Sequence, residues 1–461
     1  MLDIEITRKL QYDYRNMNDA QFESLYPPNS YEKQIEKIFI LIKEGKSMQL
    51  LGLPGTGRSI VLRLLSYNRN VRIKHIGENQ KLYHFVSCDF SEVKDENMFG
   101  ILKYLFLSLA DSLRDRGLMK EHDRIHQVFK EHLQYQDELI LFQGLKEAIY
   151  YLTAENNLTV VFLCDRFETY VPAATQKFFS NLYILRNQAK YHFSVIFSLN
   201  RLLEEYLDSS LFSDFYEYFE DATIYVPIID RPTLDFHIER LEKISGKKIQ
   251  KDVLNTLLKI TGGHGNLTRL SVEFILSHTE MNTADISYNQ LATFLLSQKA
   301  VIKNLQDIWN ILTKDEKNVL LSPEGKTPST YLKDINLLHN GIITIPLLSL
   351  AAIQKHFTSL RKESLVFDEK TNDILKGNTS IGSVLTSAEF KLLTFFLRNQ
   401  NRIVNREEVI QVVWESNQTT AGVTDQALDQ LIFRLRKKIE PDVNNPAYLQ
   451  TIKGRGFKLV A

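Results

Sequence analysis

A glycine-rich run holds the residue types best suited to chemistry in this chain. It reads Gly52-Leu53-Pro54-Gly55-Thr56-Gly57-Arg58-Ser59. Two glycines that bracket four residues, followed by a cation and a hydroxyl, are typical of a phosphate-binding loop, although Arg58 stands where lysine is usual. Glycines let backbone N–H groups curl around phosphate oxygens, and the N-terminus of a following helix adds partial positive charge. We therefore expect Mg²⁺ on the Ser59 hydroxyl and ATP or ADP bound by Gly52, Pro54, Gly55, Thr56, Gly57, Arg58, Ser59 and Ile60.

Such a loop needs a strand before it and a helix after it, and the flanking residues favour both. Residues 47–51 are a short apolar run with strand character, and the apolar spacing of residues 60–65 suits a buried helix. A plain turn without a ligand is the alternative. Strand, glycine-rich turn and helix together favour the phosphate site.

A second group of candidates follows the apolar run of residues 158–165, which ends in Asp165. A continuous run rich in β-branched residues predicts a buried parallel strand, and ligands of open α/β sheets bind at the carboxyl ends of the strands. We therefore expect Asp165 to hold Mg²⁺ together with Ser59. Hydrolytic P-loop proteins usually have Glu next, whereas this chain has Arg166. Glu168 either polarises a water or is a solvated surface residue.

Residues 192–201 predict another buried strand that ends in polar residues. Asn200 at its end is placed to sense the γ-phosphate or to orient a water. Arg186 and Arg201 are either charge-stabilising arginines or members of surface salt bridges. The catalytic candidates are Asp165, Glu168 and Asn200.

The bulk composition is that of an ordinary globular protein with several cores. The chain has 461 residues, of which 44% are hydrophobic and 24% charged, and this length predicts about three domains. Lys and Arg together number 56, as do Asp and Glu, so any surface for nucleic acid must be local. Cys88 and Cys164 form no ligand or disulfide pattern, and neither a signal peptide nor an apolar run of about 20 residues is visible, which predicts a cytoplasmic protein.

A glycine-rich turn at residues 261–266 separates two predicted helices, and Arg269 lies one turn into the second, where it is expected to point back to the nucleotide. GLPGTGRS, VVFLCD, SLN and TGGHGNLTR occur in the order found in AAA+ ATPases. Residues 30–300 resemble the origin-recognition branch of that family and the related STAND ATPases. The resemblance implies a doubly wound nucleotide-binding domain followed by a helical lid. It places the first Walker motif at Arg58 and Ser59, the second at Asp165, the two sensors at Asn200 and Arg269, and a lid histidine at His264.

The C-terminal part carries a second set of signals. Residues 365–375 alternate across an Asn-containing turn and predict a small leading sheet. Thr386, with Glu389 three residues later, is a capping box that starts a helix. Residues 423–439 predict a long helix with an apolar stripe, and residues 449–459 predict a hairpin with a basic tip.

LTSAEFKLL, VNREEVIQVVW, LIFRLRKKI and TIKGRGFKL, in this order and spacing, resemble the winged helix–turn–helix effector of OmpR-like response regulators. The resemblance implies a double-stranded DNA partner, with residues 424–439 in the major groove. Leu431 and Phe433 lie where this family usually has polar or basic residues, so they touch either thymine methyl groups or a protein partner. The expected DNA-binding residues are Gln426 and Gln430 for base edges, Arg434, Arg436, Lys437 and Lys438 for phosphates, and Lys453, Arg455 and Lys458 in the wing.

The predicted fold is therefore an α/β P-loop NTPase domain with a helical lid, followed by two winged-helix domains. Helix, helix and short strand favour a reduced winged helix before the OmpR-like domain, and its few basic residues favour internal packing over DNA reading. The expected segments are an N-terminal arm (1–28), the nucleotide-binding domain (29–230), the lid (231–300), the reduced winged helix (301–360) and the OmpR-like domain (361–461).

We predict a DNA-binding regulator, expected to be transcriptional, that is switched by ATP or ADP. Arg58 and Arg166 favour nucleotide binding over fast hydrolysis, so any ATPase activity is expected to be slow. The alternative is an oligomerising ATPase of the replication-initiator, transposition or phage-defence type, with the winged helix as a DNA or protein adaptor. A scaffold with a structural nucleotide is a third reading, and a homo-oligomer or a protein partner stays open in each case.

Overall fold

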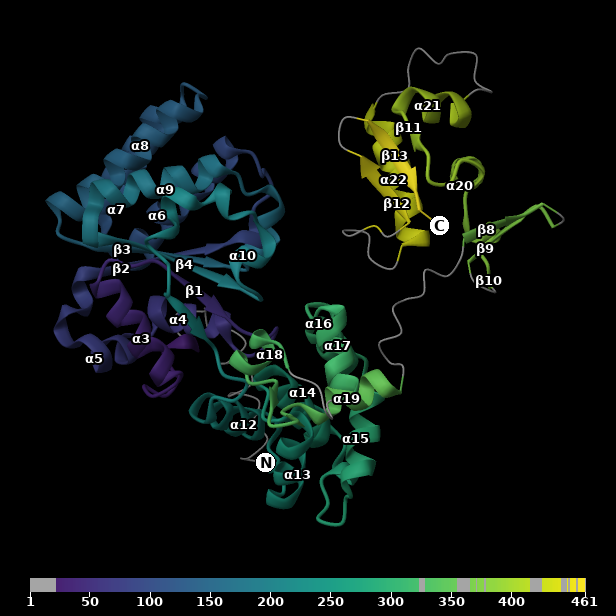
Figure 1. Ribbon diagram of the computed structural model, residues 1–461, viewed down its shortest axis with the longest axis horizontal. Coiled ribbons are helices and arrows are strands. Elements are labelled where there is room, and N and C mark those ends of the chain that lie inside the picture. Colours follow the sequence, from purple (N-terminus) through teal and green to yellow (C-terminus); the bar gives the residue numbers. More distant parts are fainter. Residues whose placement is uncertain are drawn as a thin grey trace, which may run out of the picture. The chain divides into compact units, whose positions relative to one another are not determined.

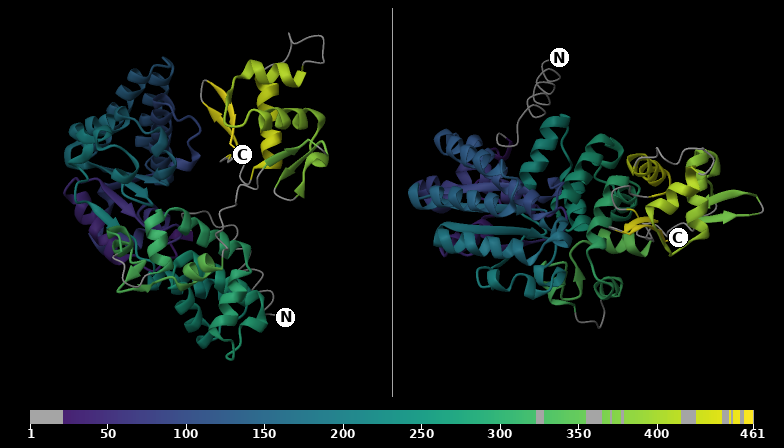
Figure 2. Two further views of the ribbon diagram at one scale, coloured as in Figure 1. Left: turned by 45° about the vertical axis from the view of Figure 1, so that its right-hand side comes forward. Right: turned by 90° about the horizontal axis from the view of Figure 1, so that it is seen from above.

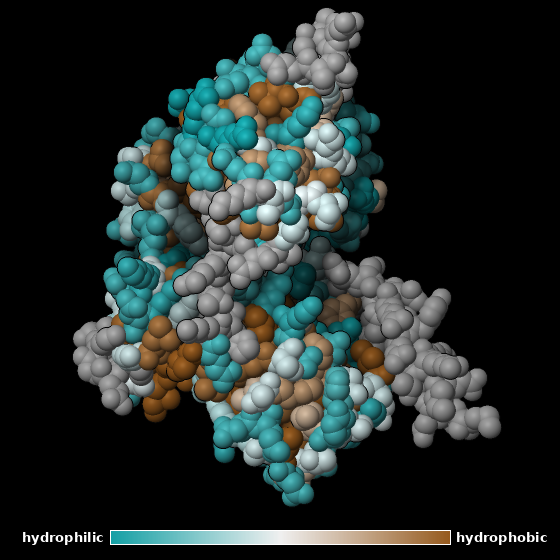
Figure 3. Space-filling view, turned by 90° about the vertical axis from the view of Figure 1, so that its right-hand side faces the viewer, coloured by the Kyte–Doolittle hydropathy of each residue, from teal (hydrophilic) through white to brown (hydrophobic). Residues whose placement is uncertain are grey.

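The computed structural model describes residues 22–322, 328–354, 365–369, 371–376, 379–414, 425–440, 446, 448–452 and 455–460. Two compact units divide the chain, Met1–Gln354 and Lys355–Ala461, and each is described by itself (Figure 1 and Figure 2). Among the described residues, none of the helices combines the length and the hydrophobicity that a membrane span requires. On the face seen in Figure 3, hydrophobic residues lie in several separate areas among hydrophilic ones.

A five-stranded parallel sheet forms the centre of the first unit, with the strand order β2-β3-β4-β1-β5 (Figure 1). Every pairing is parallel, so the carboxyl ends of all the strands lie at one edge of the sheet. This architecture confirms the predicted α/β domain and places the loop after β1 beside the end of β4. The strands are β1 (Met48–Leu51), β2 (Tyr83–Asp89), β3 (Thr159–Asp165), β4 (Phe193–Leu199) and β5 (Thr223–Tyr225).

Helices cover both faces of this sheet (Figure 1). The helices on one face are α3 (Glu32–Lys43), α4 (Arg58–Tyr67) and α5 (Arg69–Ile76). Those on the other are α6 (Met98–Asp115), α7 (Met119–Leu133), α8 (Glu138–Tyr150) and α9 (Gln176–Ala189). Because both faces are covered, side chains on both faces of a central strand are removed from water, which is why the strand sequences are mostly apolar on both faces.

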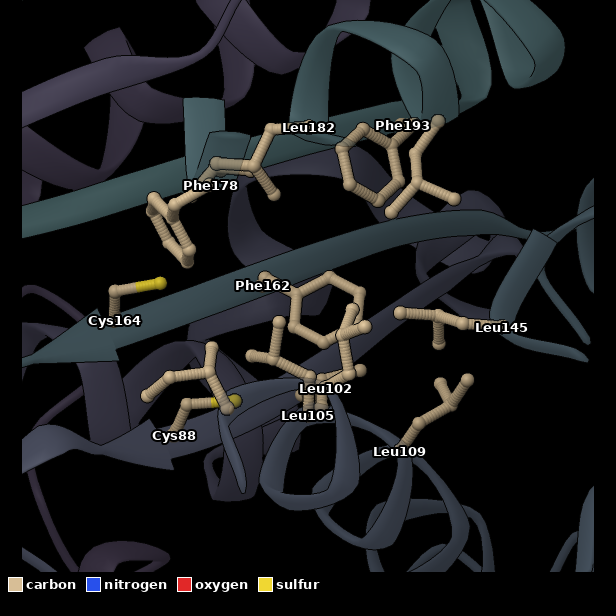
Figure 4. Packing of buried hydrophobic residues seen from close by; sticks show 14 of the residues in the cluster. Cys88, Leu102, Leu105, Leu109, Leu145, Phe162, Cys164, Phe178, Leu182 and Phe193 are labelled. Atoms are coloured by element: carbon tan, nitrogen blue, oxygen red, sulfur yellow. The ribbon is translucent and has the colours of Figure 1, made fainter. Parts of the chain in front are cut away.

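Strand β3 illustrates this double burial. Phe162 and Cys164 belong to the core under α6–α9, whereas Val161 and Leu163 belong to the core on the α3–α5 face. Figure 4 shows Phe162 among side chains of the covering helices. Cys164 lies opposite Cys88 of β2, and both thiols are free and buried. Burial raises the pKa of the Cys88 thiol to about 12, so it stays protonated and unreactive.

Two four-residue helices, α10 (Leu203–Tyr206) and α11 (Ser213–Tyr216), lie between β4 and β5. A helical region then follows the sheet, as predicted for the lid. Gly262 and Gly263, with φ of 63° and 71°, form the glycine-rich turn between α13 and α14. The helices of this region are α12 (Arg231–Ser245), α13 (Lys251–Thr261), α14 (Gly265–Ser277) and α15 (Tyr288–Leu296).

The segment expected to be a reduced winged helix continues directly from these helices. Its helices α16 and α19 pack against α14 and α13. The hairpin strands β6 and β7 have only two residues each. A second winged-helix domain is therefore not confirmed, because the described residues form short helices and a minimal hairpin packed on the lid. The elements are α16 (Lys299–Asn310), α17 (Lys314–Leu321), α18 (Thr330–Asp334), β6 (Leu338–His339), β7 (Ile342–Ile343) and α19 (Pro346–Ile353).

In its described residues, the second unit contains a leading sheet, three α-helices and a hairpin, as its sequence predicts. Strands β8 (Leu365–Asp368), β9 (Asp373–Lys376) and β10 (Thr379–Ser380) form the antiparallel leading sheet. Strands β11 (Ile403–Val404), β12 (Leu449–Ile452) and β13 (Gly456–Leu459) form a second sheet in the order β11-β13-β12. The helices are α20 (Ser387–Arg398), α21 (Arg406–Trp414) and α22 (Asp425–Ile439).

The predicted capping box at the start of α20 is confirmed. The Glu389 N–H donates to the Thr386 hydroxyl at 3.4 Å, and the Thr386 N–H donates to the Glu389 carboxylate at 2.8 Å. One core joins the helices to both sheets, with Phe396 and Leu435 from the helices, Ile374 from the leading sheet and Leu449 from the second sheet.

Candidate nucleotide site and nucleic-acid interface

The glycine-rich loop joins β1 to α4 in a conformation that needs its glycines. Gly55 and Gly57 have φ of 87° and 108°, in the left-handed region where a side chain strains the backbone. A side chain at Gly57 would also collide with the hydroxyl of Tyr31. That hydroxyl donates to the Thr56 carbonyl at 2.7 Å, so Tyr31 holds the loop from the side of α3. Sequence reasoning missed Tyr31, because a single hydroxyl contact to a distant segment leaves no local pattern.

The N-terminus of α4 is suited to an anion. The helix begins at Arg58, and among the described residues no side chain caps it. The N–H groups of its first turn therefore have no acceptor inside the helix and point toward the loop. Ser59 lies in this turn and is half-buried. The loop and the helix start thus fit the phosphates of a nucleotide, with the Ser59 hydroxyl available to Mg²⁺.

The Arg58 guanidinium lies against the ends of two neighbouring strands. Its Nη2 donates to Glu168 Oε1 at 3.0 Å and to Asn200 Oδ1 at 2.7 Å, while Nη1 lies 3.4 Å from Glu168 Oε2. Asn200 Nδ2 closes the ring by donating to Glu168 Oε1 at 2.9 Å. Three residues predicted to face the nucleotide are therefore brought together, and they are bonded to one another.

Asp165 lies at the carboxyl edge of β3, where the sequence placed it. Its Oδ1 accepts the N–H of Arg166 at 2.9 Å, and Arg166 has a left-handed φ of 51°. The Arg166 guanidinium pairs with Asp89 at the end of β2. Arg166 therefore points away from the loop and toward β2, which agrees with a role outside phosphate binding.

A groove of about 740 Å³ opens along β2 beside Asp165 and Asp89. Side chains of α4 and α6, such as Arg63 and Tyr104, form its walls. No residue of the loop from Gly52 to Gly57 lines it, although Asp165, the candidate Mg²⁺ ligand, does.

The helical region after the sheet contacts the glycine-rich loop through one backbone N–H and one histidine side chain. The Asn266 N–H donates to the Gly55 carbonyl at 3.0 Å, and His264 Nε2 lies 3.0 Å from the Pro54 carbonyl. Because His264 Nδ1 accepts the N–H of Leu267 at 3.2 Å, the proton of this neutral ring is on Nε2, which donates to Pro54. Complete burial lowers the pKa of His264 to about 4 despite these carbonyl contacts, so the ring stays neutral near pH 7.

Arg269 lies on the first turns of α14, close to this junction. Its guanidinium donates to Asn266 Oδ1 at 3.0 Å and to Glu273 at 3.3 Å. Asn266 is the residue whose N–H binds the loop, so Arg269 is brought to the edge of the site. About a third of its side chain is exposed.

The two arginines proposed as charge-stabilising groups have other partners. Arg201 donates to both carboxylate oxygens of Glu316 at 2.9 and 3.0 Å, and its guanidinium lies 4.0 Å from the ring centre of Tyr331. Arg186 donates to the Gly45 carbonyl at 2.9 Å. Neither arginine is in a surface salt bridge, because both residues are buried and the bidentate ion pair of Arg201 with Glu316 lies inside the fold. Their charge-stabilising role stays a prediction.

These contacts tie the end of β4 to the helices after the lid. The Tyr331 hydroxyl donates to the Asn200 carbonyl at 2.7 Å. Burial by itself would raise the pKa of the Glu316 carboxyl, but the Arg201 guanidinium and the Thr313 N–H outweigh it and hold that pKa below its usual value. Glu316 is thus charged inside the fold because Arg201 compensates it.

Helix α22 presents the candidate DNA-reading face of the second unit. Gln430, Arg434 and Lys437 are exposed and share one side of the helix. Phe433 lies among them with 49% of its surface exposed, and Lys437 Nζ lies 4.8 Å from its ring centre. Leu431, in contrast, is 2% exposed and belongs to the core. Of the two apolar residues left open by the sequence, only Phe433 can meet a partner.

Two other cations of α22 hold the domain together. Arg436 donates to the Leu449 carbonyl at 2.8 and 3.0 Å and to the Thr451 hydroxyl at 2.7 Å. Lys438 donates to the Val384 carbonyl at 2.8 Å and to Glu389 at 2.5 Å. In the hairpin, Arg455 is exposed and Lys458 is half-buried. Lys453 and the side chain of Gln426 lie outside the described residues.

Fold and site together define the two units by class. The first is an α/β domain with a parallel sheet, a glycine-rich loop after β1 and a helical region after the sheet, and the second is a winged helix. Residues 382–459 match the family described as "Transcriptional regulatory protein, C terminal". This match confirms the resemblance of the second unit to OmpR-like effector domains.

Curated proteins with similar sequences cover only part of this chain. Protein PetR of Rhodobacter capsulatus is 36% identical over 92 residues, which are 19% of this chain and 39% of that protein. Sensory transduction protein RegX3 of Mycobacterium tuberculosis is 42% identical over 71 residues, or 15% of this chain and 30% of that protein. The chain therefore spans less than half the length of these relatives.

Solved structures with a similar course of the chain include the Aeropyrum pernix ORC1 protein in complex with DNA, with a TM-score of 0.36, 12% identity and coverage of 77% of this chain and 89% of that one. The Walker-type ATPase PABY2304 of Pyrococcus abyssi has a TM-score of 0.38 and 12% identity, with coverage of 75% and 92%. At these low values, the assignment of the first unit rests on its strand order and its glycine-rich loop.

Proposed function

We propose that this chain is a DNA-binding regulator, expected to act on transcription in the cytoplasm, whose first unit binds ATP or ADP with Mg²⁺. The observation that carries the proposal is one junction: the lid donates the Asn266 N–H and the His264 ring N–H to the carbonyls of the phosphate loop. A phosphate seated in the loop then acts on the same backbone that holds the lid. The family match of residues 382–459 supports the DNA-binding output.

In this proposal the loop N–H groups hold the phosphates, and Ser59 and Asp165 hold Mg²⁺, which would neutralise phosphate charge when bound. Asn200 and Arg269 report the state of the nucleotide from the two sides of the site. Hydrolysis is expected to be slow, because Glu168, the candidate base, already accepts hydrogen bonds from Arg58 and Asn200.

On DNA, the exposed residues of α22 would enter the major groove. We propose that Gln430 reads a base edge, that Arg434 and Lys437 meet phosphates, and that Phe433 covers a thymine methyl group. Arg455 of the hairpin is placed for a backbone phosphate. Arg436 and Lys438 would act indirectly, by fixing α22 against the hairpin and against α20.

The experiment is a DNA titration of the full chain with no nucleotide, with ADP and with ATP, each with Mg²⁺. We expect the affinity or the stoichiometry to change with the nucleotide. Asp165→Asn should abolish that change and leave binding without nucleotide intact. Identical titration curves in all three conditions would overturn the coupling.

The alternative is an oligomerising ATPase that uses the winged helix as an adaptor. Such an ATPase needs a charge-stabilising arginine, and the burial of Arg186 and Arg201 within their own chain argues against both candidates. Steady-state ATP hydrolysis separates the two functions. Fast turnover that Asp165→Asn abolishes would favour the ATPase, and tight binding with negligible turnover would favour the regulator.

A further inference from the structure

Arg58, Glu168 and Asn200 form a ring of hydrogen bonds. Within this ring they bind one another through the polar groups that would otherwise be free to bind a γ-phosphate. Both oxygens of Glu168 face the guanidinium, and both ends of the Asn200 amide are engaged within the ring. The ring is also well shielded, because the side chains of Arg58 and Glu168 are only 10% and 17% exposed. Within the described residues, it is therefore a closed set of three mutually satisfied side chains.

The position of the ring identifies which phosphate it affects. Leu51, the last residue of β1, lies opposite Leu199 at the end of β4, so the loop begins beside Asn200. Glu168 comes three residues after the end of β3, at the same edge of the sheet. In P-loop proteins the cation after the last glycine meets the terminal phosphates, while the loop N–H groups hold those nearer the nucleoside. The ring accordingly stands at the end of the site where a third phosphate would lie.

We propose that this ring makes the site selective for a nucleoside diphosphate and that a nucleoside triphosphate binds only after Arg58 leaves Glu168. The inference rests on the proposed nucleotide site and goes further, because it names the preferred ligand class and the residues that set it. A diphosphate uses the loop N–H groups and Ser59 without disturbing the ring. A triphosphate brings its additional negative charge next to the Glu168 carboxylate.

Charge is the physical reason for this preference. If Arg58 stays in the ring, the γ-phosphate meets a carboxylate whose compensating cation is already shared, and like charges repel strongly where water is excluded. If Arg58 turns to the γ-phosphate, it leaves a mostly buried carboxylate without its partner, which is costly. Either route weakens the triphosphate complex relative to the diphosphate complex.

Opening the ring would also change contacts outside the nucleotide site. Asn200 accepts Arg58 through its side chain and the Tyr331 hydroxyl through its carbonyl. The next residue, Arg201, pairs with Glu316 of α17. Displacement of Asn200 by a triphosphate would therefore strain the contact with α18 and the pair with α17. The same ring thus selects the ligand and links its third phosphate to the helices that follow the lid.

The test measures dissociation constants of the full chain for ADP and for the β,γ-imido analogue of ATP, both with Mg²⁺, by isothermal titration calorimetry. The analogue removes hydrolysis from the comparison. We expect the wild-type protein to bind ADP at least about tenfold more tightly than the analogue. Glu168→Gln keeps the shape but removes the charge, so the analogue should bind more tightly and the ratio should fall to about threefold or less.

A second variant and a matched control keep the result interpretable. Arg58→Lys retains a cation but cannot bridge both oxygens of Glu168 and the amide of Asn200. It should therefore also reduce the ratio of the dissociation constants for the analogue and for ADP. It decides the question if thermal melting shows that Glu168→Gln does not fold. Glu147→Gln makes the same chemical change at an exposed carboxylate that pairs with Arg124, and it should leave the wild-type ratio unchanged.

Equal wild-type affinities for the two ligands, or an unchanged ratio in both ring variants, would overturn the selectivity. These outcomes would not contradict the proposed regulatory function as long as either nucleotide changes the affinity for DNA. A chain that binds neither ligand would overturn both the selectivity and the proposed nucleotide site.

Discussion

Two sets of cations in this chain differ in what surrounds them. In the first unit, Arg58 and Arg201 lie against Glu168 and Glu316, and their side chains are only 10% and 11% exposed. On α22 of the second unit, Arg434 and Lys437 are exposed. The difference teaches that a cation's type and its neighbours in sequence leave its role open. Carboxylates from distant segments hold the first set inside the fold, whereas the second set can meet an anionic partner.

The same contrast occurs within α22 itself. Arg434 and Arg436 are two residues apart, which turns them by about 200° around a helix. One therefore faces solvent, and the other reaches the Leu449 carbonyl of the hairpin. If internal and exposed groups differ in this way, substitutions at the two kinds of site should change different properties of the protein.

The largest effect is expected from Glu316→Ala. This substitution leaves the buried Arg201 guanidinium without its bidentate partner, and breaking a buried pair costs about 3–5 kcal/mol of folding stability. We expect the lower end of that range, because Arg201 Nε still donates to Glu205 at 2.7 Å. Urea unfolding of the full chain, followed through the transition of the first unit, measures the loss. Glu147→Ala is the control, because its pair with Arg124 is more than 40% exposed on both sides and should cost at most about 1 kcal/mol after solvent screening. Equal losses of folding stability in the two variants would contradict the distinction between buried and exposed ion pairs.

The next effect concerns pH and the buried histidine at the loop. Burial lowers the pKa of His264 to about 4, against about 6.5 in an unfolded chain. The folded state therefore resists protonation, so stability is complete above about pH 6.5 and falls as the pH drops toward 4, by about 3 kcal/mol for this one group. Free energies of unfolding measured between these pH values check whether stability falls, as expected, when the pH is lowered.

Burial lowers the pKa of His84 to about 3 and that of His237 to about 4, and it also lowers the pKa of His75. The wild-type pH dependence therefore contains all four histidines. His264→Gln should retain a donor for the Pro54 carbonyl and make the pH dependence shallower by the share of one histidine. Parallel curves for this variant and the wild type would show that His264 does not titrate as its burial implies.

A smaller effect separates the two kinds of cation on α22. Arg434→Ala and Lys437→Ala should each weaken DNA binding at all sequences and reduce the salt dependence of the affinity by about one ion. Arg436→Ala should instead lower the stability of the second unit by about 1–2 kcal/mol, because it removes hydrogen bonds to the hairpin, and leave the salt dependence unchanged. Binding measured from low to moderate salt distinguishes these cases. A reduced salt dependence in Arg436→Ala alone would reverse our assignment.

The smallest effect is expected at Phe433, the exposed aromatic residue between those cations. Burial of one methyl group is worth about 0.8 kcal/mol, so replacing a contacted thymine with uracil should weaken binding about fourfold. Phe433→Ala should bind both DNAs equally, because the apolar surface that senses the methyl group is gone. If the variant still distinguishes thymine from uracil, Phe433 does not read the base, and a protein-binding role is favoured.

Several elements could be read from the sequence because their causes are local. The glycine spacing and the apolar flanks predicted the turn from β1 to α4, and the structure has them there. Thr386 and Glu389 predicted the start of α20, since a capping box needs only residues three apart. The apolar stripe predicted a helix ending at Ile439, and α22 ends at that residue. The second winged helix was not confirmed, because short helices and an apolar strand are compatible with several packings.

The contacts of the candidate site could not be read in this way. Tyr31 binds the loop through a single hydroxyl, which leaves no periodic signal in sequence. Arg186 and Arg201 looked like charge-stabilising groups because they were near predicted strands, yet each is held by a carbonyl or carboxylate of another segment. Arginine has five donors and no preference of its own for phosphate over carboxylate, so its partner depends on what the fold places nearby.

Local patterns in the chain were thus enough to predict the glycine-rich loop, the parallel strands around it and the winged helix of the second unit. Each follows from glycine conformation, apolar periodicity or end-capping, which act over a few neighbouring residues. Only the tertiary structure decided that Arg58 meets Glu168 and Asn200, 110 and 142 residues away, and that Arg201 meets Glu316, 115 residues away. Strand order and helix packing create these contacts, because they bring together charged groups that no local pattern connects.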